Sequence, residues 1–254
     1  MPSRNKAGSA PPTREGSRRS AGDEVQAVLA WLERTGTQRT RDGMARYAIP
    51  SDTAYGIPVG TLRQYAKRLG RNHELAVALW ETGRYEARLL ASFVDDPAQV
   101  TAAQMDRWCR DFDSWAIVDT VCFHLFDRTS QAWRKVEPWS RRQGEFARRA
   151  AFALLASLAL HDKDAPDEQF VRYLPLLERG ATDERNFVKK AVVWALRAIG
   201  ERNHELNTAA VAVSRRLAES TEGAAGWVGR NALKELTSPK VTRRLAARRR
   251  AAKI

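Results

Sequence analysis

Two tryptophans, one aspartate and one arginine are the residues of this sequence best suited to hold a positively charged substrate. Trp115 and Asp119 lie four residues apart in WAIVD. Two later segments carry Arg149, in RRAAFALL, and Trp194, in KKAVVWALR. Residues four apart share one face of a helix, so the carboxylate and the indole of the first pair would stand side by side. A carboxylate opposes positive charge and indole faces attract cations, which suits a cationic sugar or base.

A purely structural interpretation of these residues is also open. Residues 114–127 predict a helix in which Asp119 is the only interior acid. The predicted core stripe of this helix is Val118, Val121, Cys122 and Leu125. A buried carboxylate is costly unless it is paired, so Asp119 could serve only as the partner of an arginine or a helix terminus. Trp194 could likewise be a core residue, and the twin Arg148-Arg149 could cover the core boundary with its aliphatic stems.

The remaining reactive residue types form no known catalytic pattern. The sequence contains no G-x-S-x-G, P-loop, G-x-G-x-x-G or H-E-x-x-H motif. Cys109 and Cys122 cannot make a disulfide framework and favour a reducing, cytoplasmic location. The four histidines lack metal-ligand spacing, so we expect no metal. The other six tryptophans are expected to be core or packing residues: Trp31, Trp80, Trp108, Trp133, Trp139 and Trp227.

Most of the excess positive charge lies at the two ends of the chain. Of the net charge of +13, residues 1–20 carry +4 and residues 240–254 carry +7, which leaves +2 for residues 21–239. A basic tail can follow a phosphate backbone without reading its sequence, or can serve only to keep the protein soluble. No apolar run reaches the roughly 20 residues that a membrane span needs, and the N-terminus lacks the apolar region of a signal peptide.

Between its ends the sequence predicts a series of amphipathic helices and no strand. The first helix is expected to begin at Asp23 as N-cap and to end near Gly36. Thr101 and Gln104 have the spacing of a capping box. Further helices are expected over residues 58–69, 73–83, 85–93, 114–127, 144–160, 167–179, 185–199, 204–219 and 224–236. Breaks between helices are expected at Pro50, Pro97, Pro138, Pro166 and Pro239, and a kink or short break at Pro175.

One five-residue segment occurs twice. Residues 71–75, RNHEL, recur as residues 202–206, and each copy follows a helix that ends in glycine. The offset of 131 residues is three times about 44, which lies in the range of about 40–47 residues of HEAT-type helical pairs. The fold class expected is therefore all-α, a curved superhelical solenoid of HEAT-like antiparallel helical pairs, with a concave face that could cradle a duplex.

At these residues the sequence resembles the AlkD-like DNA alkylation repair family, which contains alkylpurine DNA glycosylases built from HEAT-like repeats. Four segments carry the resemblance in order: MARY with the following GIPVGTLRQYAK (44–67), WAIVD (115–119), RRAAFALL (148–155) and VKKAVVWALR (188–197). It spans residues 23–236. The expected organisation is a disordered basic leader over residues 1–21, a HEAT-like repeat DNA glycosylase domain over 22–238 and a basic C-terminal tail over 239–254.

The resemblance implies a site and a reaction. In the family, two tryptophans, an aspartate and an arginine surround the sugar of the damaged nucleotide; by motif position they are Trp115, Trp194, Asp119 and Arg149. Tyr47, Arg148, Lys189 and Lys190 are the further candidates for DNA contact. The twin arginine leaves open whether Arg148 or Arg149 meets a phosphate.

The implied activity is excision of cationic N3- or N7-alkylated purines from duplex DNA. A cationic base needs no general acid to leave, so the carboxylate would oppose the oxocarbenium-like sugar, with no cofactor and no deep pocket for the base. The expected partner is double-stranded DNA that contains alkylated bases. The protein is expected to be a monomer and to bind no membrane. The alternatives are a non-catalytic HEAT-like DNA-binding protein and a helical-repeat scaffold for protein partners.

Overall fold

The computed structural model describes residues 21–251, and within this range the chain is helical and contains no β-strand. The all-α prediction is therefore confirmed. In chain order the elements are α1 Ala21–Thr35, α2 Gln38–Met44, the 3-10 turn η1 Ala45–Tyr47, α3 Val59–Leu69, α4 His73–Glu81, α5 Tyr85–Val94, α6 Ala102–Arg110, α7 Trp115–His124, the 3-10 turn η2 Phe126–Arg128, α8 Ala132–Ser140, α9 Glu145–His161, α10 Asp167–Gly180, α11 Asn186–Gly200, α12 His204–Ala218, α13 Gly223–Leu236 and α14 Pro239–Ala251.

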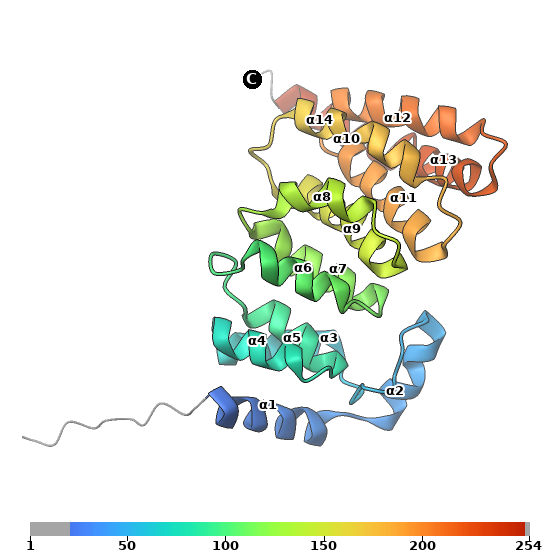
Figure 1. Cartoon of the computed structure of the whole chain (residues 1–254). Coiled ribbons are helices and arrows are strands. Elements are labelled where there is room, and N and C mark those ends of the chain that lie inside the picture. Colours follow the sequence, from blue (N-terminus) through green and yellow to red (C-terminus); the bar gives the residue numbers. More distant parts are fainter. Residues whose placement is uncertain (1–20, 252–254) are drawn as a thin grey trace, which may run out of the picture.

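Neighbouring helices pack in pairs, and the pairs stack along one direction. The pairs α4–α5, α8–α9 and α12–α13 are in extensive contact, and α5, α7, α9, α11 and α13 contact one another in succession. Figure 1 shows this order, from α1 at one end of the stack to α12 and α13 at the other. Successive pairs of antiparallel helices that each touch mainly their neighbours are the architecture of a helical-repeat solenoid.

Large apolar side chains fill the space between the helices. Trp80 and Trp108 stack with ring centroids 4.0 Å apart, and both are fully buried, as is Trp139. The predicted core stripe of α7 is confirmed, because Val118, Val121, Cys122 and Leu125 are all buried. Trp31, Trp133 and Trp227 are half-buried and pack against the same core. The six tryptophans expected to be packing residues therefore all have that role.

The repeated RNHEL segment performs the same local task in both places. Asn72 and Asn203 are the N-caps of α4 and α12, and each side chain accepts a hydrogen bond from the backbone N–H three residues later. The preceding Arg71 donates to backbone carbonyls at the end of α5, which follows it in the chain, and Arg202 donates to carbonyls at the end of the earlier helix α9. Each copy thus starts one helix and ties its N-terminus to the end of a neighbouring helix.

Several predicted boundaries differ from the structure. The first helix begins at Ala21, so Asp23 lies inside its first turn and is not an N-cap. Pro138 lies inside α8 and Pro239 is the first residue of α14, where proline is tolerated because the first-turn N–H groups have no helical partner. Pro175 causes no break in α10. Helices α2, α8 and α14 were not predicted, and the predicted leader lies outside the described residues apart from Ala21.

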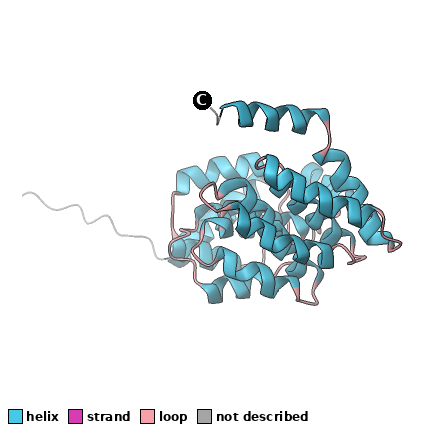
Figure 2. Cartoon of the chain, turned by 90° about the horizontal axis from the view of Figure 1, so that it is seen from above, coloured by secondary structure: helices cyan, strands magenta, loops and turns pink. Residues whose placement is uncertain are grey.

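The segment expected to be a basic tail is helical over Pro239–Ala251. Val241 and Leu245 of α14 are buried against the end of the stack, and α14 contacts α12 and α13. Seen from above, the helix that leads to the C-terminus stands to one side of the other helices (Figure 2). The positive charge of this segment is therefore held at a fixed place on the fold.

A buried glutamate anchors the chain between η1 and α3. Glu86, at the start of α5, accepts hydrogen bonds from the backbone N–H groups of Tyr55, Gly56 and Ile57 at 2.8, 2.7 and 3.1 Å. Gly56 has a φ of +85°, and a Cβ there would lie 2.3 Å from the Thr37 carbonyl oxygen. Only glycine fits this close approach. The anchor fixes the loop that follows η1, the turn that reaches the site described next.

Candidate functional site

Asp119 and Arg149 form a bidentate ion pair between α7 and α9. Arg149 Nε donates to Asp119 Oδ1 at 2.9 Å and Nη2 donates to Oδ2 at 2.7 Å. The third guanidinium nitrogen, Nη1, donates to the Phe187 carbonyl at the start of α11 at 2.6 Å. One arginine therefore ties three consecutive inner helices together and fixes the orientation of the carboxylate.

The exposure of the pair is unequal. The Arg149 side chain is 7% exposed, whereas that of Asp119 is 22% exposed. Burial raises the pKa of Asp119, and the charge and hydrogen bonds of Arg149 act in the opposite direction. Because a carboxylate has about four lone-pair directions and Arg149 takes one on each oxygen, Asp119 retains acceptor capacity toward the solvent-exposed side.

Trp115 is fixed by a hydrogen bond from a distant part of the chain. Its indole Nε1 donates to the carbonyl oxygen of Tyr47 in η1 at 2.8 Å. The Arg149 guanidinium lies 5.9 Å from the centre of the Trp115 ring, at the outer limit of a cation–π contact. Ser114 is the N-cap of α7 and accepts from the Ala116 N–H, so the helix begins at the tryptophan itself. The indole is thereby oriented at the edge of the stack.

These residues border an open pocket of about 460 Å³, which we call the Trp115 pocket. Its lining residues are Ala45, Arg46, Tyr47, Ala48, Trp115, Arg149, Asn186, Phe187 and Lys190. The Tyr47 side chain is 68% exposed at its rim. Ala48 has a φ of +51°, the only positive φ of a non-glycine residue within residues 21–251. Backbone strain of this kind, about 1–2 kcal/mol, is often found where a ligand site is held in one shape.

The structure brings together some of the predicted site residues but not all of them. Trp115, Arg149, Tyr47 and Lys190 line the Trp115 pocket, and Asp119 is bonded to Arg149 behind it. Trp194, one turn after Lys190 on α11, is half-buried against the core and does not line the pocket.

Lys189 and Arg148 have partners elsewhere. The Lys189 ammonium lies 5.4 Å from the centre of the Trp227 ring on α13. Arg148 pairs with Asp183, Nη1 to Oδ2 at 3.0 Å, and Asp183 is also held by Arg185. The neighbouring arginines thus pair with different carboxylates: Arg148 with Asp183 and Arg149 with Asp119.

Sequence reasoning missed five residues of the Trp115 pocket, namely Ala45, Arg46, Ala48, Asn186 and Phe187. Arg46 precedes Tyr47 in the MARY segment, and its position beside a predicted DNA contact was a usable signal. Asn186 and Phe187 begin α11 immediately before the VKK run. Phe187 packs against Phe146 of α9 with ring centroids 5.4 Å apart, and only the packing of the two helices reveals this contact.

A second basic pocket lies where α3, α5 and α7 end. It has a volume of about 330 Å³ and is lined by Arg63, Ala66, Lys67, Gly70, Arg71, Phe93, His124 and Arg128, without a carboxylate. Burial and the positive charges of Arg63, Arg128 and His161 lower the pKa of His124 to about 4. The His124 ring packs edge-on against Phe93 at 5.1 Å. Four cations around a neutral aromatic pair favour an anionic partner at this edge of the stack.

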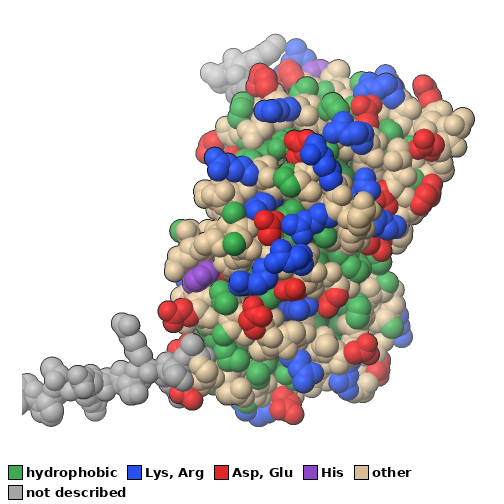
Figure 3. All heavy atoms as spheres, in the orientation of Figure 1, with side chains coloured by type: hydrophobic (Ala, Val, Ile, Leu, Met, Phe, Trp, Pro, Cys, Tyr) green, Lys and Arg blue, Asp and Glu red, His purple; other side chains and the backbone are tan. Residues whose placement is uncertain are grey.

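Elsewhere opposite charges are closely mixed. The face of the stack seen in Figure 3 carries Lys and Arg side chains over its middle and upper part with Asp and Glu between them. Asp106 illustrates the mixing, because it binds Lys135 and Arg142 at 2.6 and 3.1 Å. Within residues 21–251 no group of three or more His, Cys, Asp or Glu side chains could hold a metal ion. No helix of that range is long and apolar enough to cross a membrane.

The paired, stacked helices have the fold of a known class of helical-repeat proteins. A solved structure of a protein from a family described as related to the HEAT-like repeat DNA glycosylases, with affinity for branched DNA structures, superposes with a TM-score of 0.69. That protein is 19% identical, and the match covers 81% of this chain and 92% of the other, so the HEAT-like fold is confirmed.

The sequence itself gives the family. The model of the family described as DNA alkylation repair enzyme matches residues 28–236, and the chain belongs to this family. The predicted resemblance is therefore confirmed, and the matched range contains the site residues. Helix α14 lies beyond the match. No curated protein sequence matches this chain.

Proposed function

We propose that the protein is a DNA N-glycosylase that releases cationic N3- or N7-alkylated purines from double-stranded DNA. In the reaction the bond between C1′ and the base nitrogen breaks, and the electron pair stays on the base, which leaves neutral. A water oxygen then bonds to C1′ and gives up its proton to the solvent. No external acid is needed because alkylation has already made the base cationic. The observation that supports this assignment most is the partly exposed Asp119 carboxylate, held by Arg149 beside Trp115 in a DNA alkylation repair fold.

Asp119 is the candidate to stabilise the oxocarbenium-like sugar. The bidentate contact with Arg149 orients the carboxylate before the substrate arrives, so little reorganisation is required in the transition state. The same contact withdraws negative charge from the oxygens. The exposed lone pairs of Asp119 are then the ones that face the sugar and the attacking water.

Trp115 and Trp194 are proposed to offer aromatic faces to the damaged nucleotide. The hydrogen bond from Trp115 to the Tyr47 carbonyl supports this role for the first indole, because it keeps the ring at the pocket. Trp194 would act from the half-exposed surface of α11 outside the pocket. The Trp115 pocket is open, which supports a lesion bound without deep insertion of the base.

The cations around the pocket are proposed to contact the DNA backbone. Lys190 lines the pocket and is exposed, and Lys189 lies on the same turn of α11. Arg149 has a second N–H on each terminal nitrogen, so it can reach a phosphate while it positions Asp119. Tyr47 and Arg148 complete the proposed contacts, and the protein acts as a monomer without a cofactor.

A direct test is to incubate the purified protein with duplex DNA that contains 7-methylguanine and to measure free base under single-turnover conditions. Asp119→Asn is expected to lower the rate of release at least tenfold, about 1.4 kcal/mol of barrier. Asp183→Asn is the matched control, because Asp183 also pairs with an arginine at the start of α9, but that arginine, Arg148, does not line the pocket as Arg149 does. Equal losses in both variants would assign Asp119 to structure alone.

The second candidate function is DNA binding without excision. Two observations favour it: both oxygens of Asp119 are engaged by Arg149, and the structurally similar protein is described by affinity for branched DNA. The same assay separates the candidates. A protein that binds duplex or four-way DNA tightly and releases no base from any N-methylpurine would belong to this second class.

A further inference from the structure

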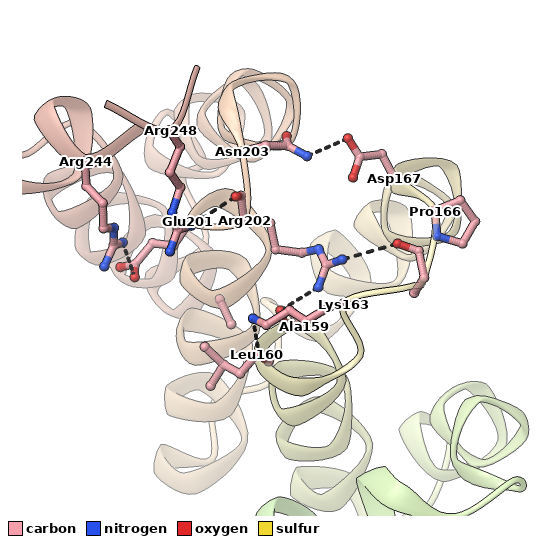
Figure 4. A pocket seen from close by; sticks show the side chains of 12 residues that line it. Ala159, Leu160, Lys163, Pro166, Asp167, Glu201, Arg202, Asn203, Arg244 and Arg248 are labelled. Carbon is pink, nitrogen blue, oxygen red and sulfur yellow. Dashed lines mark hydrogen bonds and ion pairs between the residues drawn. The ribbon is translucent and has the colours of Figure 1, made fainter. Parts of the chain in front are cut away.

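Helix α14 completes a basic pocket at the end of the stack opposite the N-terminal helices. The pocket has a volume of about 490 Å³ and is formed by the turn after α9, the turn between α11 and α12, and α14 (Figure 4). We call it the α14 pocket. Its charged lining residues are Lys163, Asp167, Glu201, Arg202, Arg244 and Arg248. Of the lining residues, Arg244 and Arg248 of α14 lie beyond the residues that match the family, and the others lie within them.

The contacts that hold α14 in place neutralise only part of the positive charge of this helix. Arg244 Nη2 pairs with Glu201 Oε2 at 2.5 Å. Arg248 Nη1 donates to the backbone carbonyls of Glu201 and Arg202 at 2.9 and 3.1 Å, so its charge meets no carboxylate there. Figure 4 shows both side chains reaching from α14 to the Glu201 end of the pocket.

The other side of the pocket has the same excess of cations. Arg202 donates to the carbonyls of Ala159, Asp162 and Ala165, which are neutral acceptors. The Lys163 ammonium donates to the Leu160 carbonyl.

Four cations thus surround the pocket with two carboxylates, Glu201 and Asp167, and Asp167 accepts a hydrogen bond from the Asn203 side chain at 2.7 Å. The charge of the lining is therefore positive and incompletely paired.

Two further observations indicate positive charge that the protein itself does not compensate around the pocket. Burial and the charges of Arg202 and Arg248 lower the pKa of Lys163, so the cations repel one another across the pocket. In addition, the buried Nε atoms of Arg202 and Arg244 have no hydrogen-bond partner. A bound anion would offset this positive charge.

The rest of α14 favours a polyanion over a small ion. The helix carries six cations, Lys240, Arg243, Arg244, Arg248, Arg249 and Arg250, and no acid. Arg249 and Arg250 border a neighbouring pocket of about 340 Å³ on α14, whereas Lys240 and Arg243 line neither pocket. A single phosphate would occupy only part of the α14 pocket, whereas a phosphodiester chain could continue along the helix.

We propose that the α14 pocket binds a phosphodiester group of DNA and gives the protein a second backbone contact, remote from the Trp115 pocket. Helix α9 relates the two sites, because Arg149 near its start lines one and Ala159 near its end lines the other. Ten residues of helix span roughly 15 Å. The proposal rests on the proposed function only for the choice of DNA as the polyanion.

The test is the salt dependence of binding to an undamaged 24-base-pair duplex, measured with the full chain. Lys163→Gln combined with Arg248→Gln is expected to weaken binding at least tenfold and to reduce the slope of log K against log salt by about two, since each phosphate contact contributes roughly 0.9. The matched control is Lys240→Gln combined with Arg243→Gln, which removes the same charge from the exposed face of the same helix. It is expected to change affinity less than threefold.

Equal effects in the two double variants would overturn the proposal. They would mean that α14 attracts DNA through its total positive charge and that the pocket makes no specific contact. Should the first double variant melt early, Lys163→Gln alone replaces it: this exposed lysine loses one bond to a carbonyl, and the slope should fall by about one.

A melting temperature that rises with inorganic phosphate only when Lys163 and Arg248 are present, with DNA affinity unchanged in the variant, would assign the pocket to a small anion and also overturn the proposal. Release of base from 7-methylguanine DNA by both double variants at saturating protein concentration is the separate readout of the proposed glycosylase, and it does not depend on the salt slopes.

Discussion

The indole N–H of Trp115 donates to the backbone carbonyl of Tyr47 across 68 residues of sequence, at 2.8 Å. This bond joins the start of α7 to η1, and Tyr47 and its neighbours close one side of the Trp115 pocket. The bond therefore does two things at once: it orients the aromatic ring and it holds the rim of the pocket. Substitutions that keep the ring but remove the N–H separate these effects.

Trp115→Phe keeps an aromatic face but loses the hydrogen bond. We expect the single-turnover rate of base release to fall about tenfold, because the rim that carries Tyr47 is no longer fixed, while the free energy of unfolding falls by only about 1 kcal/mol. Base release and urea unfolding measure the two quantities. Trp31→Phe is the control, since Trp31 stacks on Tyr65 and neither residue lines the pocket. An unchanged rate in Trp115→Phe would mean that the bond to Tyr47 is not needed for function.

Arg149→Gln tests whether this arginine positions Asp119 or binds a phosphate. As a positioning residue that also contacts a phosphate, it should lower the rate of base release at least tenfold and reduce the slope of log K against log salt for duplex binding by about one. The twin variant Arg148→Gln, which loses the bond to Asp183, is the comparison for the rate, because Arg148 does not pair with Asp119. An unchanged slope in Arg149→Gln would leave Arg149 as a positioning residue only.

Trp194→Ala addresses the one proposed aromatic residue that lies outside the pocket. If its ring contacts the damaged nucleotide, the substitution should reduce the rate of base release more than it reduces the affinity for undamaged duplex. Trp227→Ala on α13 is the natural comparison, because Trp227 is also half-buried and lies beside Lys189. Parallel losses of rate and affinity in Trp194→Ala would identify Trp194 as a packing residue.

The sequence predicted those features that depend on local periodicity. Most helices followed from apolar spacing and caps, as with Thr101, whose side chain accepts from the Gln104 N–H at 3.1 Å. The sequence does not indicate helix α8, because Pro138 favours a break, whereas in the structure this proline lies inside the last turns of the helix. Helix α14 is not predicted because Val241 and Leu245 are its only large apolar residues among many arginines. Their burial depends on contact with α12 and α13, which the sequence does not reveal.

The site was predictable in its composition but not in its pairing. The spacing of Trp115 and Asp119 placed them on one helix, yet no local pattern indicates that Arg149 meets Asp119 while Arg148 meets Asp183. That choice depends on how α9 is rotated between α7 and α11. The contact from Trp115 to Tyr47 likewise requires the loop anchored by Glu86, which is a tertiary feature.

The neutral state of His124 makes the stability of the fold depend on pH. The pKa of His124 is about 4 in the folded protein, because burial and the charges of Arg63, Arg128 and His161 disfavour the imidazolium, and it returns to about 6.5 on unfolding. Between these values the unfolded chain binds more protons than the folded chain, so the free energy of unfolding falls as the pH drops from 6.5 toward 4.

His124→Phe removes this titration and keeps a ring between Phe93 and Phe123. Between pH 7 and pH 5 the wild type should lose about 1 kcal/mol more stability than the variant, a value reduced about twofold for the partial exposure of the ring. Urea unfolding at the two pH values measures the difference. His204→Gln, at the exposed first residue of α12, should lose as much as the wild type. Identical losses in wild type and His124→Phe would show that the ring is not held neutral by the cations of α3 and η2.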